Sequence, residues 1–302
     1  MDMGPSSISH RTGLLLTAMA SLLWGTTFIA SQVGFHYTNP YNLVFLRFAT
    51  AAVVVIVFGL PFDNKVGLKR ELAKKSTWMV GGVYALGFLL QFVGQDLTTA
   101  SEATLLSNLA PILVPTVAFA VLKDSMTSTQ KVATVLGFAG LFLVASPRLS
   151  MNVTSLSGDV LLFGTSLCYT LFIVASKQLK VGSVGRSLAY IVATAVFLAP
   201  VAVYFGRLNV LDLRIGWTGW ASVLYLGFPC TLIAISAYLK GLSVVTVSES
   251  AILLLIQILA GLVLASLLLG EFLSLSQAIG AVAIMSALVL GVKRASKPNS
   301  AR

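Results

Sequence analysis

Polar side chains recur at helical spacing inside otherwise apolar stretches of the chain. Tyr84, Phe88, Gln91 and Gln95 follow one another at intervals of four, three and four residues, which places them on one face of a predicted helix. Two amides and a phenol on one side of an apolar helix need hydrogen-bonding partners or water. This face is therefore a candidate cavity wall.

A second polar face lies in residues 13–33, where hydroxylated residues at helical spacing flank Trp24 and include Thr27. One interpretation is close helix packing through small hydroxylated residues. The other is the wall of a wet cavity in which Trp24 provides a stacking surface. Further polar or aromatic side chains occur within other apolar stretches. The candidate substrate-binding residues are Trp24, Thr27, Tyr84, Phe88, Gln91, Asn108, Tyr169, Tyr238 and Gln257.

Charged residues within the apolar stretches are candidates for a charge pair or for ion coupling. Arg47 lies well inside the segment that begins at residue 40, and a cation at that depth is costly unless it is paired or reaches water. The alternative is that its side chain extends to the headgroups. Glu102 and Glu249 stand near helix starts, where each either suits the helix dipole or carries a proton. A pairing of Arg47 with Glu102 is geometrically allowed.

Catalytic patterns are scarce. His10 and His36 fall in predicted loops, and no metal-ligand spacing or phosphate-cradling motif is present. Cys168 and Cys230 lie within apolar segments, where small buried hydrophobes are the expected role. We therefore predict no catalytic residue, no metal and no cofactor. A pocket of neutral hydrogen-bonding groups and aromatic rings instead favours binding of a small molecule.

The composition requires a membrane environment. Of the 302 residues, 57% are hydrophobic and 10% are charged, and such a sequence cannot cover a soluble surface. Ten apolar segments can be marked, each long enough to cross a hydrocarbon core of about 30 Å. They span residues 13–33, 40–60, 77–97, 101–122, 130–146, 157–177, 187–205, 217–239, 248–269 and 276–292.

The net charge of +10 orients the chain rather than binding a nucleic acid. With the N-terminus in the cytoplasm, most Lys and Arg residues fall in cytoplasmic loops or in the basic tail, as the positive-inside rule requires. The sequence thus predicts an all-α polytopic protein of the plasma membrane with both termini cytoplasmic.

The chain contains an internal repeat. The stretch 101–130 resembles the stretch 248–277, with Glu102 matching Glu249. A second similar pair is Ser21–Gln32 and Ser166–Lys177. We therefore predict two five-helix repeats, residues 1–147 (helices 1–5) and residues 148–302 (helices 6–10). Because five is an odd number, the second repeat must be inverted in the membrane, an arrangement typical of secondary transporters.

These patterns resemble the drug/metabolite transporter superfamily, specifically its EamA-type members, along the whole chain. The matching positions are Trp24-Gly25, Leu46-Arg47-Phe48, Ala103, Leu105-Leu106, Pro111, Asp124, Gln130, Ser250, Leu253, Glu271 and Gln277-Ala278-Ile279-Gly280. The resemblance implies ten helices around a central substrate cavity, alternating access, and export or exchange of metabolites such as amino acids, with the fifth and tenth helices away from the cavity. The sequence departs from the pattern at Ile258, where a proline is expected, and at Asp124, where glutamate is commoner.

We accordingly expect a secondary active transporter of a small organic metabolite, most simply an amino acid. The expected partners are the solute, the lipid bilayer and, for coupling, protons; the protein is expected to be a monomer or a homodimer. The alternative function is a non-transporting membrane sensor or assembly protein with the same fold.

Overall fold

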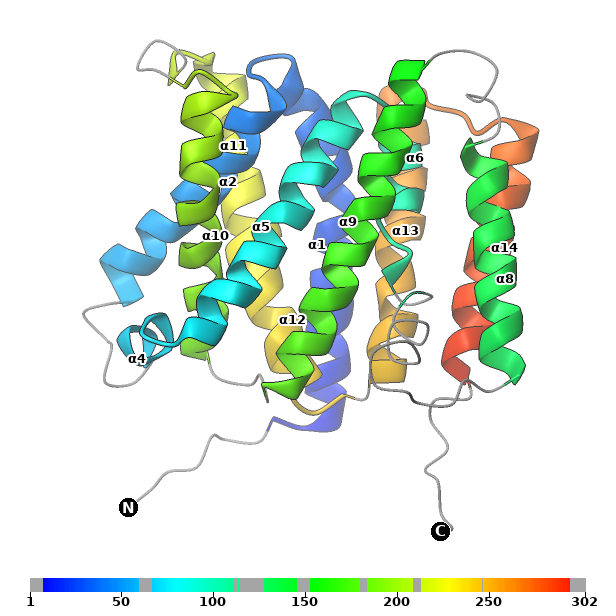
Figure 1. The fold of residues 1–302 in the computed structure, drawn as a ribbon, viewed down its shortest axis with the longest axis horizontal. Coiled ribbons are helices and arrows are strands. Elements are labelled where there is room, and N and C mark those ends of the chain that lie inside the picture. The colour runs from blue at the N-terminus through cyan, green and yellow to red at the C-terminus, as the bar shows by residue number, and fades with distance from the viewer. Residues whose placement is uncertain are drawn as a thin grey trace.

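Helices make up the described part of the chain, and no strand occurs in it (Figure 1). The computed structural model describes residues 8–59, 67–110, 113, 128–145, 153–179, 184–208, 213–245 and 247–293. The first half contains α1 (His10–Phe35), α2 (Pro40–Val54) with the π-helix η1 (Val55–Gly59), α4 (Leu68–Leu72), α5 (Lys75–Asp96), α6 (Ala100–Leu106) and α8 (Ser128–Ala145). The second half contains α9 (Val153–Gln178), α10 (Val184–Tyr204), α11 (Gly216–Gly227), the π-helix η4 (Phe228–Ile233), α12 (Ala234–Leu242), α13 (Val247–Leu269) and α14 (Leu275–Lys293).

The prediction of an all-α polytopic fold is confirmed. Six helical stretches in the described residues are long and apolar enough to cross a membrane: His10–Phe35, Pro40–Phe58, Lys75–Asp96, Leu156–Ser176, Val184–Tyr204 and Gly216–Leu242. Shorter apolar helices occupy parts of α8, α13 and α14. The fourth predicted segment is described mainly in its first part, and Pro111 and Pro115 lie outside the described residues.

The helices begin where local chemistry favours a start. Asn39 caps α2, because its side chain accepts a hydrogen bond from the Asn42 backbone at 2.9 Å and Pro40 occupies the first turn. Thr99 caps α6 in the same way by accepting from the Glu102 backbone at 3.2 Å. These caps fix the residue at which each of the two helices begins.

Helices of the two halves of the chain pack against each other. From the first half, α1 packs on α11, α12 and α13; from the second half, α9 packs on α5 and α6. Further contacts between the halves join α10 with α2, α4 and α5, α2 with α11, and α8 with α14. In Figure 1, α8 and α14 stand together at one edge of the molecule, away from α2, α10 and α11. The interface between the halves therefore runs through the centre of the bundle.

The contact between α8 and α14 depends on two glycines. A Cβ atom added at Gly140 would lie 2.7 Å from the carbonyl oxygen of Gly280, and one added at Gly280 would lie 2.6 Å from that of Gly140. Real Cβ atoms do not approach backbone oxygens so closely. Small residues that let two helix backbones meet are typical of membrane helix pairs.

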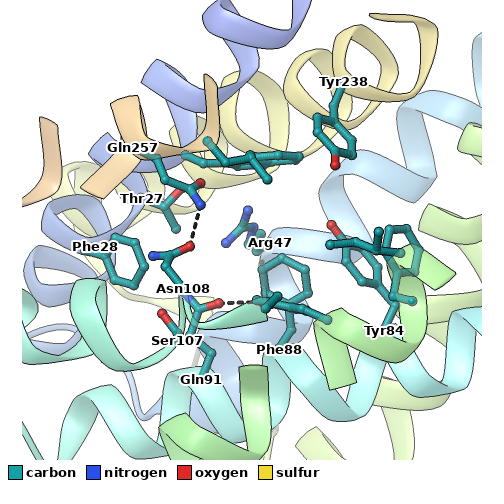
Figure 2. Close-up of a pocket in the computed structure, with 16 residues that line it drawn as sticks. Thr27, Phe28, Arg47, Tyr84, Phe88, Gln91, Ser107, Asn108, Tyr238 and Gln257 are labelled. Atoms are coloured by element: carbon teal, nitrogen blue, oxygen red, sulfur yellow. Dashed lines mark hydrogen bonds between the residues drawn. The ribbon is translucent and has the colours of Figure 1, made fainter. Parts of the chain in front are cut away.

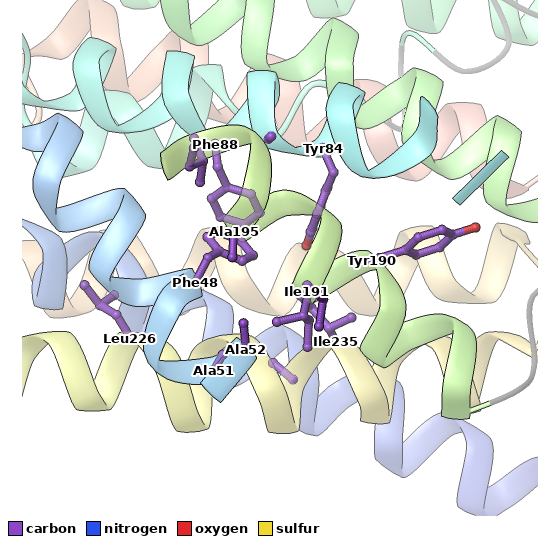
Figure 3. Close-up of a cluster of buried hydrophobic side chains, with 14 of the residues drawn as sticks. Phe48, Ala51, Ala52, Tyr84, Phe88, Tyr190, Ile191, Ala195, Leu226 and Ile235 are labelled. Carbon is purple, nitrogen blue, oxygen red and sulfur yellow. The ribbon is translucent and has the colours of Figure 1, made fainter. Parts of the chain in front are cut away.

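Buried apolar side chains fill the space between α2, α5, α10 and α12 (Figure 3). Phe48, Tyr84 and Phe88 belong to this cluster, where they face Ile191 and Ile235 from the second half. Two of these aromatic residues, Tyr84 and Phe88, also line the pocket described next, so the cluster supports one of its walls.

Candidate functional site: a pocket between the halves

A pocket with a cavity volume of about 90 Å³ lies in the middle of the helical bundle (Figure 2). Residues from α1, α2, α5, α9, α12 and α13, together with residues 107–110 after α6, line it. They are Trp24, Thr27, Phe28, Arg47, Tyr84, Phe88, Gln91, Ser107, Asn108, Ala110, Tyr169, Phe172, Ile173, Tyr238, Leu254 and Gln257.

Aromatic rings form much of the pocket wall. Tyr84 stacks on Phe172 with ring centroids 4.1 Å apart, and it meets Phe88 edge-on at 4.8 Å. On another side, the Trp24 and Tyr238 rings lie 5.0 Å apart in a tilted arrangement. Such contacts hold the rings in fixed positions while leaving their other surfaces available to a ligand.

The two pocket amides on α5 and α13 are bonded across the boundary between the halves. The Tyr169 hydroxyl, on α9, donates to Oε1 of Gln91 on α5. Gln257, on α13, donates through Nε2 to Oδ1 of Asn108, which follows α6. Figure 2 marks both bonds. A buried amide without a partner is costly, so these bonds explain how neutral polar groups persist here.

Arg47 is the one charged side chain among the described residues that line the pocket. It is 0% exposed. Its Nε donates to Oγ1 of Thr231 at 2.6 Å, and its Nη2 donates to the backbone oxygen of Cys230 at 3.0 Å. Its Cζ atom lies 4.6 Å from the Phe88 ring centroid, a cation–π distance. The guanidinium therefore stays inside the protein, and extension to the headgroups does not occur.

The π-helix η4 supplies the acceptors for Arg47. The Ala234 N–H donates to the Pro229 oxygen, five residues back, and to that of Thr231, not to the Cys230 oxygen as α-helical pairing would require. The Cys230 oxygen instead accepts from Arg47 Nη2 and from Trp24 Nε1, the latter at 3.1 Å. The π-helix thus turns a backbone carbonyl toward the pocket.

The charge pair considered between Arg47 and Glu102 is not formed among the described residues. Glu102 is buried in α6, where it accepts a hydrogen bond from Nε2 of Gln277 on α14. Glu271 occupies the start of α6 instead, accepting from the backbone of Ala100 at 3.1 Å through Oε1 and of Ser101 at 2.8 Å through Oε2. The Glu249 side chain lies outside the described residues.

The structure places all the candidate binding residues around one pocket, but it separates the hydroxylated face of α1 into two groups. Thr27 lines the pocket, whereas Ser21 and Ser31 donate to backbone carbonyls one turn back, both at 2.8 Å. Gln95 also packs away from the pocket, accepting from Ser31 at 2.9 Å and donating to the Phe28 oxygen at 2.7 Å. The residues of this face are therefore divided between the pocket wall and contacts outside the pocket, and its role as the wall of a wet cavity stays a prediction.

Sequence analysis did not single out several residues that shape the pocket. Most of them are apolar residues within apolar segments, so their type does not distinguish them from their neighbours in the sequence. They are Phe28, Ala110, Phe172, Ile173 and Leu254. Ser107 also lines the pocket. The two cysteines are free and buried, and the described residues contain no group of side chains suited to hold a metal ion.

An ion-pair cluster joins the halves at the end of the bundle where α4 lies (Figure 1). Glu71 of α4 accepts from Lys74 Nζ at 2.7 Å and from Arg186 Nε at 2.9 Å, and Arg186 belongs to α10. Burial alone would raise the pKa of Glu71, but the hydrogen bonds and charges of Arg186 and Lys74 outweigh it and hold the pKa below its ordinary value. Glu71 is therefore ionised at neutral pH.

Comparison with known proteins gives matches along nearly the whole chain. The EamA-like transporter family matches twice, over residues 11–146 and over residues 156–292. The uncharacterized transporter YyaM of Bacillus subtilis (strain 168) is 26% identical over 286 residues, covering 91% of this chain and 90% of that protein. An uncharacterized transporter of Archaeoglobus fulgidus is 28% identical over 238 residues, covering 75% of this chain and 78% of its own.

One solved crystal structure has the same fold, with a TM-score of 0.68 at 20% sequence identity over 95% of this chain and 100% of that one. The two family matches fall one in each half, and the described helices are long and apolar enough to span a membrane. The protein is therefore a multi-pass protein of the plasma membrane, and the chain belongs to the EamA-like transporter family.

Proposed function

We propose that the protein is a secondary active transporter that moves a small organic metabolite by alternating access around the central pocket. One observation supports this most strongly: the pocket lies between the two halves and takes its aromatic rings and amides from both. Secondary transporters built from inverted repeats bind their solutes at such an interface, and rocking of one repeat against the other changes the side from which the site is reached.

The cross-half hydrogen bonds suit this mechanism. The Tyr169–Gln91 and Gln257–Asn108 bonds each join one half to the other, so a rocking motion must lengthen or break them. A solute with its own donors and acceptors replaces the lost partners of the two amides. Binding and opening are in this way coupled, because the empty pocket loses hydrogen bonds on opening that the occupied pocket keeps.

The pocket chemistry favours hydrophobic or aromatic amino acids as solutes, by export or exchange. Aromatic walls accept an apolar side chain, and neutral amides bind polar backbone groups. A sugar phosphate, with two negative charges, would require more cationic side chains than the single Arg47 found among the described lining residues. No catalytic role is proposed for any of these residues.

Proton coupling is proposed through Glu102, which is buried beside Gln277, and through Glu249 at the equivalent position of the second half. A carboxylate that binds and releases a proton during the cycle makes transport depend on pH. Glu102→Gln removes the titration of this carboxyl group while keeping a similar shape, so the transport rate of the variant should depend less on pH than that of the wild type. An unchanged pH profile would reject Glu102 as the proton carrier.

The experiment that tests the function is counterflow of radiolabelled amino acids in proteoliposomes. We expect uptake of labelled phenylalanine into vesicles loaded with unlabelled phenylalanine, and its loss in Trp24→Ala. The matched control is Trp217→Ala, because Trp217 is 83% exposed on α11 and lies outside the pocket. Absence of counterflow for every amino acid tested, in folded protein, would favour the non-transporting sensor or assembly role.

A further inference from the structure

The Arg47 guanidinium has one nitrogen that no protein atom satisfies. Nε and Nη2 are bonded to Thr231 and to the Cys230 carbonyl, whereas the buried Nη1 has no hydrogen-bond partner. Figure 2 shows Arg47 in the midst of the other lining residues, between Asn108 and Tyr84. A buried donor of a charged group that lacks a partner costs more than an ordinary unmade hydrogen bond.

Within the described part of the chain, no anion compensates the charge of Arg47. Neither of its hydrogen-bond acceptors, the Thr231 hydroxyl and the Cys230 carbonyl, carries a charge, and no Asp or Glu occurs among the described lining residues. The Phe88 ring offsets only part of the cost through its cation–π contact. Taking a cation out of water carries a desolvation penalty that a neutral partner does not fully offset. The described lining residues therefore leave the charge of Arg47 without a partner of opposite charge.

We infer that Arg47 binds the carboxylate of the transported solute through Nη1, which makes small monocarboxylates with an apolar or aromatic body the substrate class. This inference rests on the proposed function and specifies the group that the site recognises. Charge-assisted hydrogen bonds between guanidinium and carboxylate are strong and directional. One cation matches one negative charge, and a carboxylate carries one.

The neighbouring groups fit such a ligand. Thr27 Oγ1 is a second buried polar atom of the pocket without a hydrogen-bond partner, and it can donate to a carboxylate oxygen or accept from a solute amine. The aromatic rings of Trp24, Tyr84 and Tyr238 line the pocket, so the apolar part of a bound solute would contact these rings. The π-helix holds Arg47 through two of its nitrogens, so the third is fixed in position before the solute arrives and loses little entropy on binding.

The test compares phenylalanine, phenylalaninamide and 3-phenylpropionate for binding to purified full-length protein by isothermal titration calorimetry. Phenylalaninamide keeps the ring and the amine but lacks the carboxylate, whereas 3-phenylpropionate keeps the ring and the carboxylate. We expect wild-type protein to bind both carboxylates at least about 30-fold more tightly than the amide, as is typical for a buried hydrogen-bonded charge pair.

Arg47→Gln should remove that preference by weakening both carboxylates about 30-fold while leaving amide binding unchanged. Arg11→Gln makes the same charge change at an exposed residue and should bind all three as the wild type does. A purely structural role for Arg47 would instead weaken all three ligands equally. If Arg47→Gln does not fold, as judged by size-exclusion chromatography, the wild-type preference alone decides.

Equal wild-type affinity for phenylalanine and its amide, or binding of neither carboxylate, would overturn the inference. Failure of the proposed function gives a different result: Arg47-dependent carboxylate binding without any counterflow in proteoliposomes. Counterflow of phenylalanine that persists unchanged in Arg47→Gln would keep the transporter and reject Arg47 as its anion-binding residue.

Discussion

Substitution of Glu71 by Gln should destabilise the contact between the two halves at one end of the bundle. The Glu71 side chain is 2% exposed, whereas Arg186 is 15% exposed and Lys74 is 39% exposed. Gln keeps the shape of Glu but removes the charge, so Arg186 loses its ionic partner across the halves while the packing of α4 on α10 is retained. The change isolates the electrostatic part of the contact.

The expected cost follows from the exposure of the partners. Removing one partner of a fully buried ion pair costs about 3–5 kcal/mol, and exposed pairs contribute about 1 kcal/mol or less. The Glu71–Arg186 pair lies between these limits, so Glu71→Gln should lower the free energy of unfolding by about 2 kcal/mol. Lys74→Gln should cost no more than about 0.5 kcal/mol, because the Lys74 side chain is more exposed than that of Arg186.

The assay is equilibrium unfolding in mixed micelles for the wild type, Glu71→Gln, Arg186→Gln and the double variant. A double-mutant cycle should give a coupling energy of about 1–2 kcal/mol between Glu71 and Arg186. The Arg186 single variant should cost more than this, because Arg186 also donates to the Leu179 carbonyl. A coupling energy near zero, or a Lys74→Gln effect as large as that of Glu71→Gln, would refute the reasoning.

The same pair predicts a pH dependence with a definite sign. The folded-state pKa of Glu71 lies below its ordinary value, so the stabilisation is fully present above the unfolded pKa of about 4.3. It is lost as the pH falls through the lower folded-state pKa. Glu71→Gln should therefore flatten the loss of stability of the wild type below about pH 4.

Three further predictions follow from described contacts. Gly140→Val should separate α8 from α14, because its Cβ would meet the Gly280 oxygen at 2.7 Å; a lower melting temperature and slower cysteine crosslinking between these helices would show it, and unchanged crosslinking would contradict it. Glu271→Gln should cost about 1 kcal/mol by weakening the cap on α6, measured by equilibrium unfolding, and no loss would contradict it. Asn108→Leu and Gln257→Leu should each cost about 1–3 kcal/mol, and the double variant should cost less than their sum; additive costs would show that the two amides do not depend on each other.

The helices and much of the pocket lining could be predicted because both depend on how apolar and polar residues alternate along a short stretch of sequence. Apolar length sets where a helix runs, and spacing of three and four residues identifies which side chains share a face. Tyr84, Phe88 and Gln91 reach one pocket for this reason. Whether these residues bind a solute is what the counterflow and calorimetric experiments test.

Spacing could not tell which part of a polar face meets the pocket. Ser31 and Thr27 share a face of α1, yet Ser31 bonds to Gln95 and Thr27 lines the pocket, because the neighbouring helices decide which residues they cover. The hydrogen-bond partners of Arg47 could not be predicted from the sequence either. They belong to residues far along the chain, and one of them is a backbone carbonyl, which every residue type has.

The π-helix at Phe228–Ile233 constrains how the length of this chain can change during evolution. A π-turn closes its hydrogen bond over one residue more than an α-helix does, so deleting one residue within it would restore α-helical pairing while leaving α12 facing much as before. Tyr238 would keep its place at the pocket, but the Cys230 carbonyl would return to the helix and be lost to Arg47 and Trp24. A relative that is one residue shorter between Gly227 and Tyr238 should therefore lack an arginine at the position of Arg47.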